Sequence, residues 1–258
     1  MSRQDLLYIY CIAQIGRDQA FEVNGLGDRG LVEGATGLRA VRYEHIAAVV
    51  SDIATREPEP NRESTLAHEA VVDGVMGSYP ILPVRFGTVA DGAQEIREKL
   101  LRRRYGEFLG LLREMSGKVE LGLKVFWRDM GAVFKEIVAE ERAVGEMRDK
   151  LASRQRLTQA EAVHLGKLVE AALDAKRQRE AGQILGVLSD LADEVSLNGI
   201  LLDQMVLNAA FLVAIDREAD FDQKVAALDA HLGERLRLKY VGPMAPFNFV
   251  NIIVHWEE

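Results

Sequence analysis

The chain has 258 residues, of which 48% are hydrophobic and 28% are charged, and its formal net charge at pH 7 is -8. This composition is typical of a globular protein and argues against a disordered or fibrous class. The acidic charge argues against non-specific binding to nucleic acid or to an anionic membrane. The length allows one large domain or two ordinary ones, and we expect two.

The sequence also predicts where the protein resides. Cys11 is the only cysteine, which excludes an intrachain disulfide and fits a reducing compartment. We interpret Cys11 as a small core residue. No apolar run reaches the ~18 residues that a membrane-spanning helix needs, and the first residues lack a signal-peptide pattern. We therefore expect a cytoplasmic protein that enters no membrane.

The first half of the chain predicts a mixture of strands and helices. The expected strands are 6–15, 38–43 and 45–50, and the expected helices are 64–76 and 94–115, with a split at Tyr105. A literal G-x-G-x-x-G runs from Gly25 to Gly30, but it does not join a strand directly to a helix, as a dinucleotide site requires. We interpret that segment as a loop.

The segment 80–89 carries the most distinctive local pattern. Pro80 and Pro83 remove backbone donors, so the segment predicts an extended strand at a sheet edge. Arg85 lies within this apolar run, where its charge needs a partner or a route to water, and we expect it to be an internal hydrogen-bonding anchor. Gly87 permits a turn or a close backbone approach.

The second half predicts one more sheet. The expected elements are a strand at 118–128, a helical region at 131–193, strands at 193–202 and 205–215, a helix from about 220, and a strand at 235–241. Capping boxes at Thr158 to Glu161 and at Asp220 to Gln223 mark two helix starts. This order is that of a ferredoxin-like βαββαβ domain with an expanded first crossover. The fold class is therefore α+β, in two domains.

A second distinctive pattern closes the chain. Gly242, Pro243 and Pro246 predict a rigid kink after the last strand, and the apolar run 249–254 predicts that the strand then resumes.

The two distinctive segments resemble motifs of the gas vesicle protein family GvpF/GvpL. Leu82 to Thr88 is similar to one motif, and Tyr240 to Val250 is similar to the closing motif, although Met244 stands where the family commonly has an aromatic residue. The run from Ile46 to Asp52 also resembles the family, so the resemblance spans about 6–254. The matching positions, candidates for partner contact or structural anchoring, are Pro83, Arg85, Phe86, Gly87, Gly242, Pro243, Pro246, Phe247 and Asn248.

The resemblance implies an accessory or minor structural protein of gas vesicles. Such a protein would act in vesicle assembly by binding the hydrophobic shell protein GvpA, and other gas vesicle accessory proteins are further expected partners. The resemblance also implies two α+β domains, the second a modified ferredoxin type. From the residues themselves, Gly117 is a natural boundary, so we expect the domains at 1–116 and 117–258, with a helical hairpin at about 131–193 in the second. An alternative hypothesis is a general cytoplasmic scaffold that docks a partner on this hairpin without contacting the shell.

An enzyme with an unrecognised site is a third hypothesis. The five histidines form no H-x-x-x-H pair, so no local zinc site is predicted. The sequence contains no G-x-S-x-G, P-loop or calcium-loop pattern. We expect no catalytic, metal or cofactor site; an enzyme would instead have a deep pocket with perturbed titratable groups.

Overall fold

The computed structural model describes residues 5–16, 19–22, 31–152, 158–250, 252–254 and 256. The chain divides into two compact units: unit 1 contains 1–120 and 243–258, and unit 2 contains 121–242. The expected boundary assigned 243–258 to the second domain, whereas the described residues of this segment group with unit 1. The glycine pattern from Gly25 to Gly30 lies outside the described residues.

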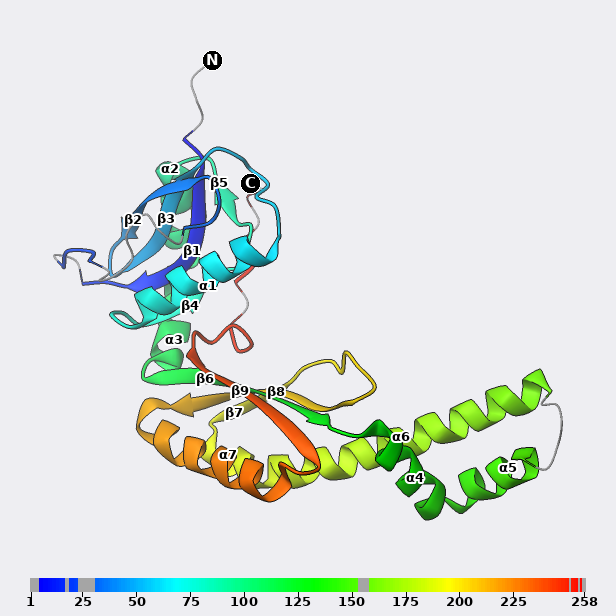
Figure 1. Cartoon of the computed structure of the whole chain (residues 1–258). Coiled ribbons are helices and arrows are strands. Elements are labelled where there is room, and N and C mark those ends of the chain that lie inside the picture. Colours follow the sequence, from blue (N-terminus) through cyan, green and yellow to red (C-terminus); the bar gives the residue numbers. More distant parts are fainter. Residues whose placement is uncertain are drawn as a thin grey trace. The chain divides into compact units, whose positions relative to one another are not determined.

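In the described part of unit 1, five strands form one sheet in the order β2-β3-β1-β4, with β5 also paired to β1 (Figure 1). Their bounds are β1 Leu7–Gln14, β2 Ala35–Tyr43, β3 Ile46–Ile53, β4 Ile81–Pro83 and β5 Val89–Ala90. The central strand, β1, is buried from Leu7 to Ala13. Its unbroken apolar run is explained by this position, with helices on both faces of the sheet.

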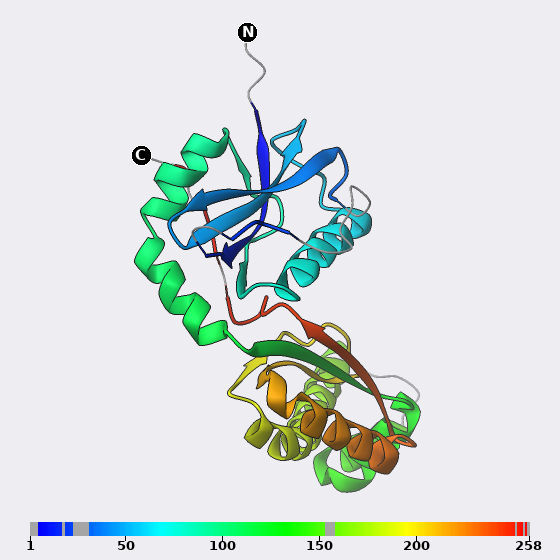
Figure 2. The ribbon, with the colours of Figure 1, turned by 90° about the vertical axis from the view of Figure 1, so that its left-hand side faces the viewer.

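Helices cover the two faces of this sheet (Figure 2). On one face lies α1, Arg62–Met76, whose first turn is capped by the Asn61 side chain accepting the Ser64 N–H at 2.8 Å. On the other face lie α2, Ala93–Glu95, a π-helical segment, Ile96–Arg102, and α3, Tyr105–Met115. The expected split near Tyr105 falls just before α3.

Strands β2 and β3 form a hairpin that the sequence did not signal. Tyr43 pairs with Ile46, so only Glu44 and His45 make the turn. Glu44 has a φ of 52°, which is uncommon for a residue other than glycine, asparagine or aspartate. The strands were therefore predictable, but their tight connection was not.

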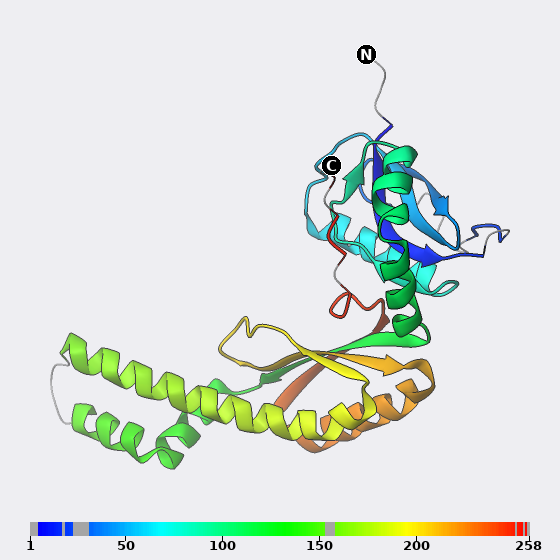
Figure 3. The ribbon, with the colours of Figure 1, turned by 180° about the vertical axis from the view of Figure 1, so that it is seen from behind.

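Most of a second sheet lies in unit 2, in the order β7-β8-β6-β9, with α6 and α7 on one face (Figure 1). The strands are β6 Lys118–Trp127, β7 Glu194–Leu197, β8 Met205–Ala214 and β9 Leu236–Met244. The helices are α4 Met130–Glu140, α5 Arg142–Ala152, α6 Gln159–Leu188 and α7 Glu218–Leu232. Figure 3 shows part of α6 running beside α5, away from the sheet. The fold is α+β, as expected.

One predicted capping box is confirmed and the other is wrong. At the start of α6 the Thr158 hydroxyl accepts the Glu161 N–H at 3.3 Å, and the Glu161 carboxylate accepts the Thr158 N–H at 3.2 Å. Helix α7 instead begins at Glu218, directly after a 3₁₀ turn, Ile215–Arg217. Asp220 therefore lies inside the first turn, where its charge favours the helix dipole without capping.

Among the described helices, none is long and apolar enough to cross a membrane.

Candidate functional site

The segment 84–88 leaves the sheet of unit 1 as a bulge between β4 and β5, which both pair with β1. The Val84 N–H donates to the Tyr10 carbonyl at 3.0 Å, and the Thr88 carbonyl accepts the Ile9 N–H at 2.9 Å. Gly87 has a φ of 84°, a conformation that favours glycine. The expected strand at a sheet edge is confirmed for β4 alone, because the turn at Gly87 carries the rest of the expected span 80–89 out of the sheet before β5.

A buried polar network holds this bulge from below. The Gly87 N–H donates to the Tyr8 hydroxyl at 3.2 Å, and this hydroxyl lies 2.8 Å from Nδ1 of His68. Nε2 of His68 lies 3.1 Å from the Val84 carbonyl, which can only accept. His68 is therefore a neutral imidazole that donates a hydrogen bond from Nε2 and accepts a hydrogen bond from the Tyr8 hydroxyl at Nδ1. Burial lowers the pKa of His68 from 6.5 to about 4.

The lowered pKa of His68 predicts a loss of stability in mild acid. The unfolded chain binds this proton below about pH 6.5 and the folded chain only below about pH 4, so stability falls as pH drops through this window. The full loss is about 3 kcal/mol. In urea unfolding between pH 7 and 4, His68→Gln should lose correspondingly less stability than the wild type. Equal losses in the two proteins would contradict the assignment.

The closing segment 243–250 is held in unit 1 by two carboxylates. Asp73 accepts the Ala245 N–H at 3.0 Å. Glu120 accepts the Asn248 N–H at 2.8 Å and also the side-chain amide of Asn248. Glu120 is 2% exposed, and burial raises its pKa, with the nearby charge of Asp73 acting in the same direction. We call these two carboxylates and the amides they hold the carboxylate clasp.

Within the clasp the chain turns, and among the described residues of the expected strand 249–254 only Ile252 makes a β-bridge. The Pro246 carbonyl accepts the N–H groups of Phe249 and Val250 at 3.2 and 3.0 Å. Beyond this turn, a single parallel bridge joins Val84 to Ile252. The turn uses the N–H groups of 249 and 250, so these two donors are not available to a neighbouring strand.

The bulge and the closing segment meet at a cavity of about 340 Å³, which we call the motif cavity. Its walls include Phe86, Phe247, Val250 and Ile252, and Arg85 and Glu69 also line it. The rings of Phe86 and Phe247 lie 5.8 and 6.2 Å from the His68 ring. Two sequence motifs that are far apart in the chain thus line one cavity.

The structure gives the predicted site residues different positions. Gly242 has a φ of 135°, which, as at Gly87, favours glycine. Pro83 and Pro246 are buried, whereas Pro243 is exposed. The Arg85 side chain is exposed, and among the described residues it has no hydrogen-bond or ion-pair partner. Arg85 therefore differs from the expected internal anchor.

Four residues of this region escaped the sequence analysis: Tyr8, His68, Asp73 and Glu120. Each acts through a partner distant in the chain, such as Asn248 for Glu120 at a separation of 128 residues. The residues next to each of these four in the sequence therefore give no indication of its distant partner.

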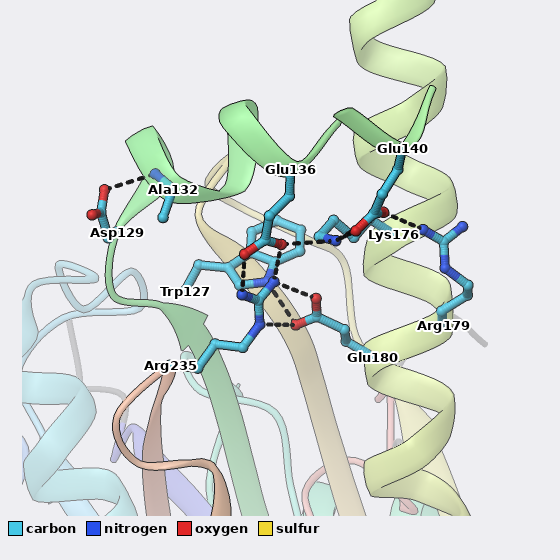
Figure 4. Close-up of polar contacts among 9 residues, drawn as sticks. All are labelled: Trp127, Asp129, Ala132, Glu136, Glu140, Lys176, Arg179, Glu180 and Arg235. Atoms are coloured by element: carbon cyan, nitrogen blue, oxygen red, sulfur yellow. Dashed lines mark hydrogen bonds and ion pairs between the residues drawn. The ribbon is translucent and has the colours of Figure 1, made fainter. Parts of the chain in front are cut away.

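A second polar cluster lies in unit 2 and joins α4, α6 and the start of β9 (Figure 4). Arg235 makes two hydrogen bonds to Glu136, of 2.6 and 2.7 Å, and two to Glu180, of 2.8 and 3.5 Å. Lys176, whose side chain is 7% exposed, lies 2.9 Å from Glu136 and 3.0 Å from Glu140. We call these residues, with Arg179, the charge cluster.

The electrostatics of the charge cluster indicate a structural role. The hydrogen bonds from Arg235 and then from Lys176 lower the pKa of Glu136 to about 2. The Trp127 indole N–H donates to Glu180 at 2.8 Å, and Arg179 pairs with Glu140 at 3.4 Å. Every charged group in this cluster has an opposite charge as its partner, so the cluster offers no free charge to a ligand.

Other candidate chemistry is limited in the described residues. Cys11 is a buried free cysteine, and burial raises the pKa of its thiol, which fits a core residue. Across 5–256, leaving aside the undescribed positions, no three His, Cys, Asp or Glu side chains are placed to hold a metal ion.

Comparison with known proteins adds three findings. The family model described as gas vesicle synthesis protein GvpL/GvpF matches residues 6–251. Gas vesicle protein F of Dolichospermum flosaquae is 28% identical over 74% of this chain and 78% of its own length, and that of Haloferax mediterranei is 26% identical over 96% and 94%. The crystal structure of GvpF from Anabaena sp. PCC7120 superposes with a TM-score of 0.81 at 25% identity, covering 97% of this chain and 100% of that one.

Proposed function

The chain belongs to the GvpL/GvpF family of gas vesicle proteins, and from this premise we propose that it is a non-enzymatic accessory protein of gas vesicle assembly. It binds the small hydrophobic shell protein GvpA and limits the aggregation of that protein before it enters the vesicle wall. Its place in the cell is the cytoplasm, in association with forming vesicles.

The observation that carries this proposal is the motif cavity. Both family motifs line it, and the polar network and the carboxylate clasp hold its walls in place. Phe86 and Phe247 give it an aromatic lining suited to an apolar side chain of a partner. A preformed apolar cavity lets a protein bind one hydrophobic subunit without exposing a large apolar surface that would itself promote aggregation.

The motif positions then have two roles. Pro83, Gly87, Gly242, Pro243, Pro246 and Asn248 are structural anchors that shape the bulge and the clasp. Arg85 is the contact residue, because its guanidinium is exposed beside the cavity and is left unpaired among the described side chains. It is placed to bind a carboxylate or a backbone carbonyl of the partner. Phe86 and Phe247 serve both roles.

We also propose that unit 2 is a modified ferredoxin-like domain. Its support is the element order, strand, helices, two strands, helix, strand, and the sheet order β7-β8-β6-β9. Three helices, α4, α5 and α6, occupy the place of the first crossover helix. On this proposal the helical hairpin is an addition to a common frame.

The test is binding of purified protein to the GvpA-type shell protein encoded in the same genome, at modest and at high salt. The wild-type chain should capture the shell protein and reduce its light scattering. Arg85→Glu should weaken binding by about tenfold, because it reverses the charge beside the cavity. Arg113→Ala is the matched control: Arg113 is an exposed arginine on α3, on the other face of the sheet, and its loss should leave binding unchanged.

Different results would separate the hypotheses. If the wild-type chain captured no shell protein at either salt concentration, direct shell binding would be excluded, and a scaffold acting on other accessory proteins would be favoured. If the Arg85→Glu and Arg113→Ala variants bound the shell protein equally well, the residues of the motif cavity would have a structural role only. Persistence of binding at high salt would assign most of the affinity to apolar contact.

A further inference from the structure

The loop that joins β7 to β8 displays an apolar surface on unit 2. Leu197, Ile200, Leu201 and Leu202 are 63%, 43%, 72% and 52% exposed. We call residues 197–202 the apolar loop; it stands away from the sheet in Figures 1 and 3. Four large aliphatic side chains this close together on a surface are unusual unless they bind something.

The apolar loop is held in a fixed conformation. The side-chain amide of Asn208, which is nearly buried, donates to the Gly199 carbonyl at 2.9 Å. At the far end of the connection, Arg177 donates to the carbonyls of Asp203 and Met205 at 3.1 and 2.9 Å. Binding of a partner here therefore costs little conformational entropy, because the loop is already ordered.

The adjacent strand, β7, has an outer edge free for pairing. Within the described residues, the sheet order ends at β7. The Asn198 N–H donates to the Asn208 carbonyl at 2.7 Å, so in the antiparallel register 194, 196 and 198 face β8. The backbone groups of Val195 and Leu197 alternate with them and point away from β8.

The opposite edge of the same sheet is protected in a way that β7 is not. Strand β9 carries Arg237 and Lys239 and reaches Pro243, and charged residues and proline both deter strand addition. Strand β7 contains no proline, its one charged residue is Glu194 at its first position, and its other end leads directly into the apolar loop. The two edges therefore differ in how readily they accept another strand.

We propose that the outer edge of β7 and the apolar loop form a docking surface that captures an extended apolar segment of the shell subunit as an added strand. This inference rests on the proposed function. Backbone hydrogen bonds to Val195 and Leu197 supply affinity, and the loop leucines select apolar side chains. A second copy of this chain is a poorer occupant, because each copy carries a formal net charge of -8 and two copies therefore repel each other.

Three variants test the surface in the same shell-protein binding assay. Leu201→Asp combined with Leu202→Asp should weaken binding at least tenfold, since it places charge where apolar side chains dock. Leu197→Pro removes an outward N–H without removing a hydrogen bond to β8, and should weaken binding similarly. Ile215→Asp is the matched control: Ile215 is an exposed aliphatic residue just beyond the far end of β8, 56% exposed, and its loss should change nothing.

Amide hydrogen exchange supplies a readout specific to strand addition. On binding, exchange at Val195 and Leu197 should slow, whereas 194 and 196 already face β8 in the free protein. Unfolding midpoints equal to the wild type show that the variants fold.

The possible outcomes distinguish a failure of this inference from a failure of the proposed shell-protein binding. No capture by the wild-type chain would overturn both. Capture that the loop and edge variants retain would overturn the docking surface alone. Concentration-dependent dimers of the free chain, abolished by the loop variant, would reassign the surface to a second copy and so overturn the proposal.

Discussion

Replacing Glu120 with Ala should destabilise unit 1 by about 2–3 kcal/mol and release the closing segment. The substitution leaves two donors of Asn248 without their acceptor in a site where Glu120 is 2% exposed. A fully buried unmet donor costs about 1–3 kcal/mol, but Asn248 is exposed and water replaces part of what its donors lose, so most of the expected loss comes from the space left by the buried Glu120 side chain. Part of this cost is offset, because a buried carboxylate near Asp73 is itself unfavourable, as its raised pKa shows. Urea unfolding measures the change.

The accompanying loss of order is measured by limited proteolysis of 243–250. Cleavage there should be much faster in Glu120→Ala than in the wild type. Glu120→Gln is the matched control, because it keeps the side-chain length and one acceptor oxygen, and should retain part of the protection. A Glu120→Ala protein with wild-type stability and wild-type resistance would show that the clasp does not hold the segment.

Replacing Arg235 with Met should destabilise unit 2 by about 2–3 kcal/mol. Breaking a buried ion pair costs about 3–5 kcal/mol, and we expect less here because the Arg235 side chain is 36% exposed. Glu136 loses its bidentate partner, and its pKa should rise from about 2 toward its ordinary value. In the wild type, the lowered pKa of Glu136 contributes stability that is lost as the pH falls from about 4.5 toward 2. The Arg235→Met variant should lack most of this contribution even at neutral pH, and should therefore lose less stability over the same pH range.

Arg235→Lys tests whether geometry or charge matters. Lysine keeps the positive charge but cannot make the two parallel bonds to Glu136, so it should recover less than half of the loss. In a double-mutant cycle, Glu136→Ala and Arg235→Ala should be less harmful together than the sum of the two. Additive losses would mean that the bond between them contributes nothing measurable to stability.

The sequence predicted features that depend on neighbouring residues. The capping box at Thr158 and Glu161 is confirmed because both partners lie within one helical turn. The helix start at Asp220 was misplaced because the preceding 3₁₀ turn had already begun the helix. The bulge at 84–88 was missed because proline and apolar residues predict an extended strand, and Gly87 alone does not reveal which way the chain turns.

The candidate site was only half predictable. The two motifs identified Arg85, Phe86 and Phe247, but nothing in them indicated that they line one cavity, since that depends on the long-range bonds of Asp73 and Glu120. The carboxylate pairings, like that of His68 with Tyr8, join distant parts of the chain. Such pairings are set by the packed fold, and single-sequence patterns do not report them.

The return of 243–252 to unit 1 has a consequence for biosynthesis. The ribosome synthesises 121–242 before the closing segment. While unit 2 is being translated, Asp73 and Glu120 therefore lack the N–H groups of the closing segment that they bind in the folded protein. The motif cavity, which needs Phe247, Val250 and Ile252, cannot exist on a nascent chain that ends at 242. If this cavity receives the shell subunit, translation delays that capture until residue 252 has emerged from the ribosome. A cell that makes the hydrophobic shell protein at the same time would then load only chains that have been translated through this segment.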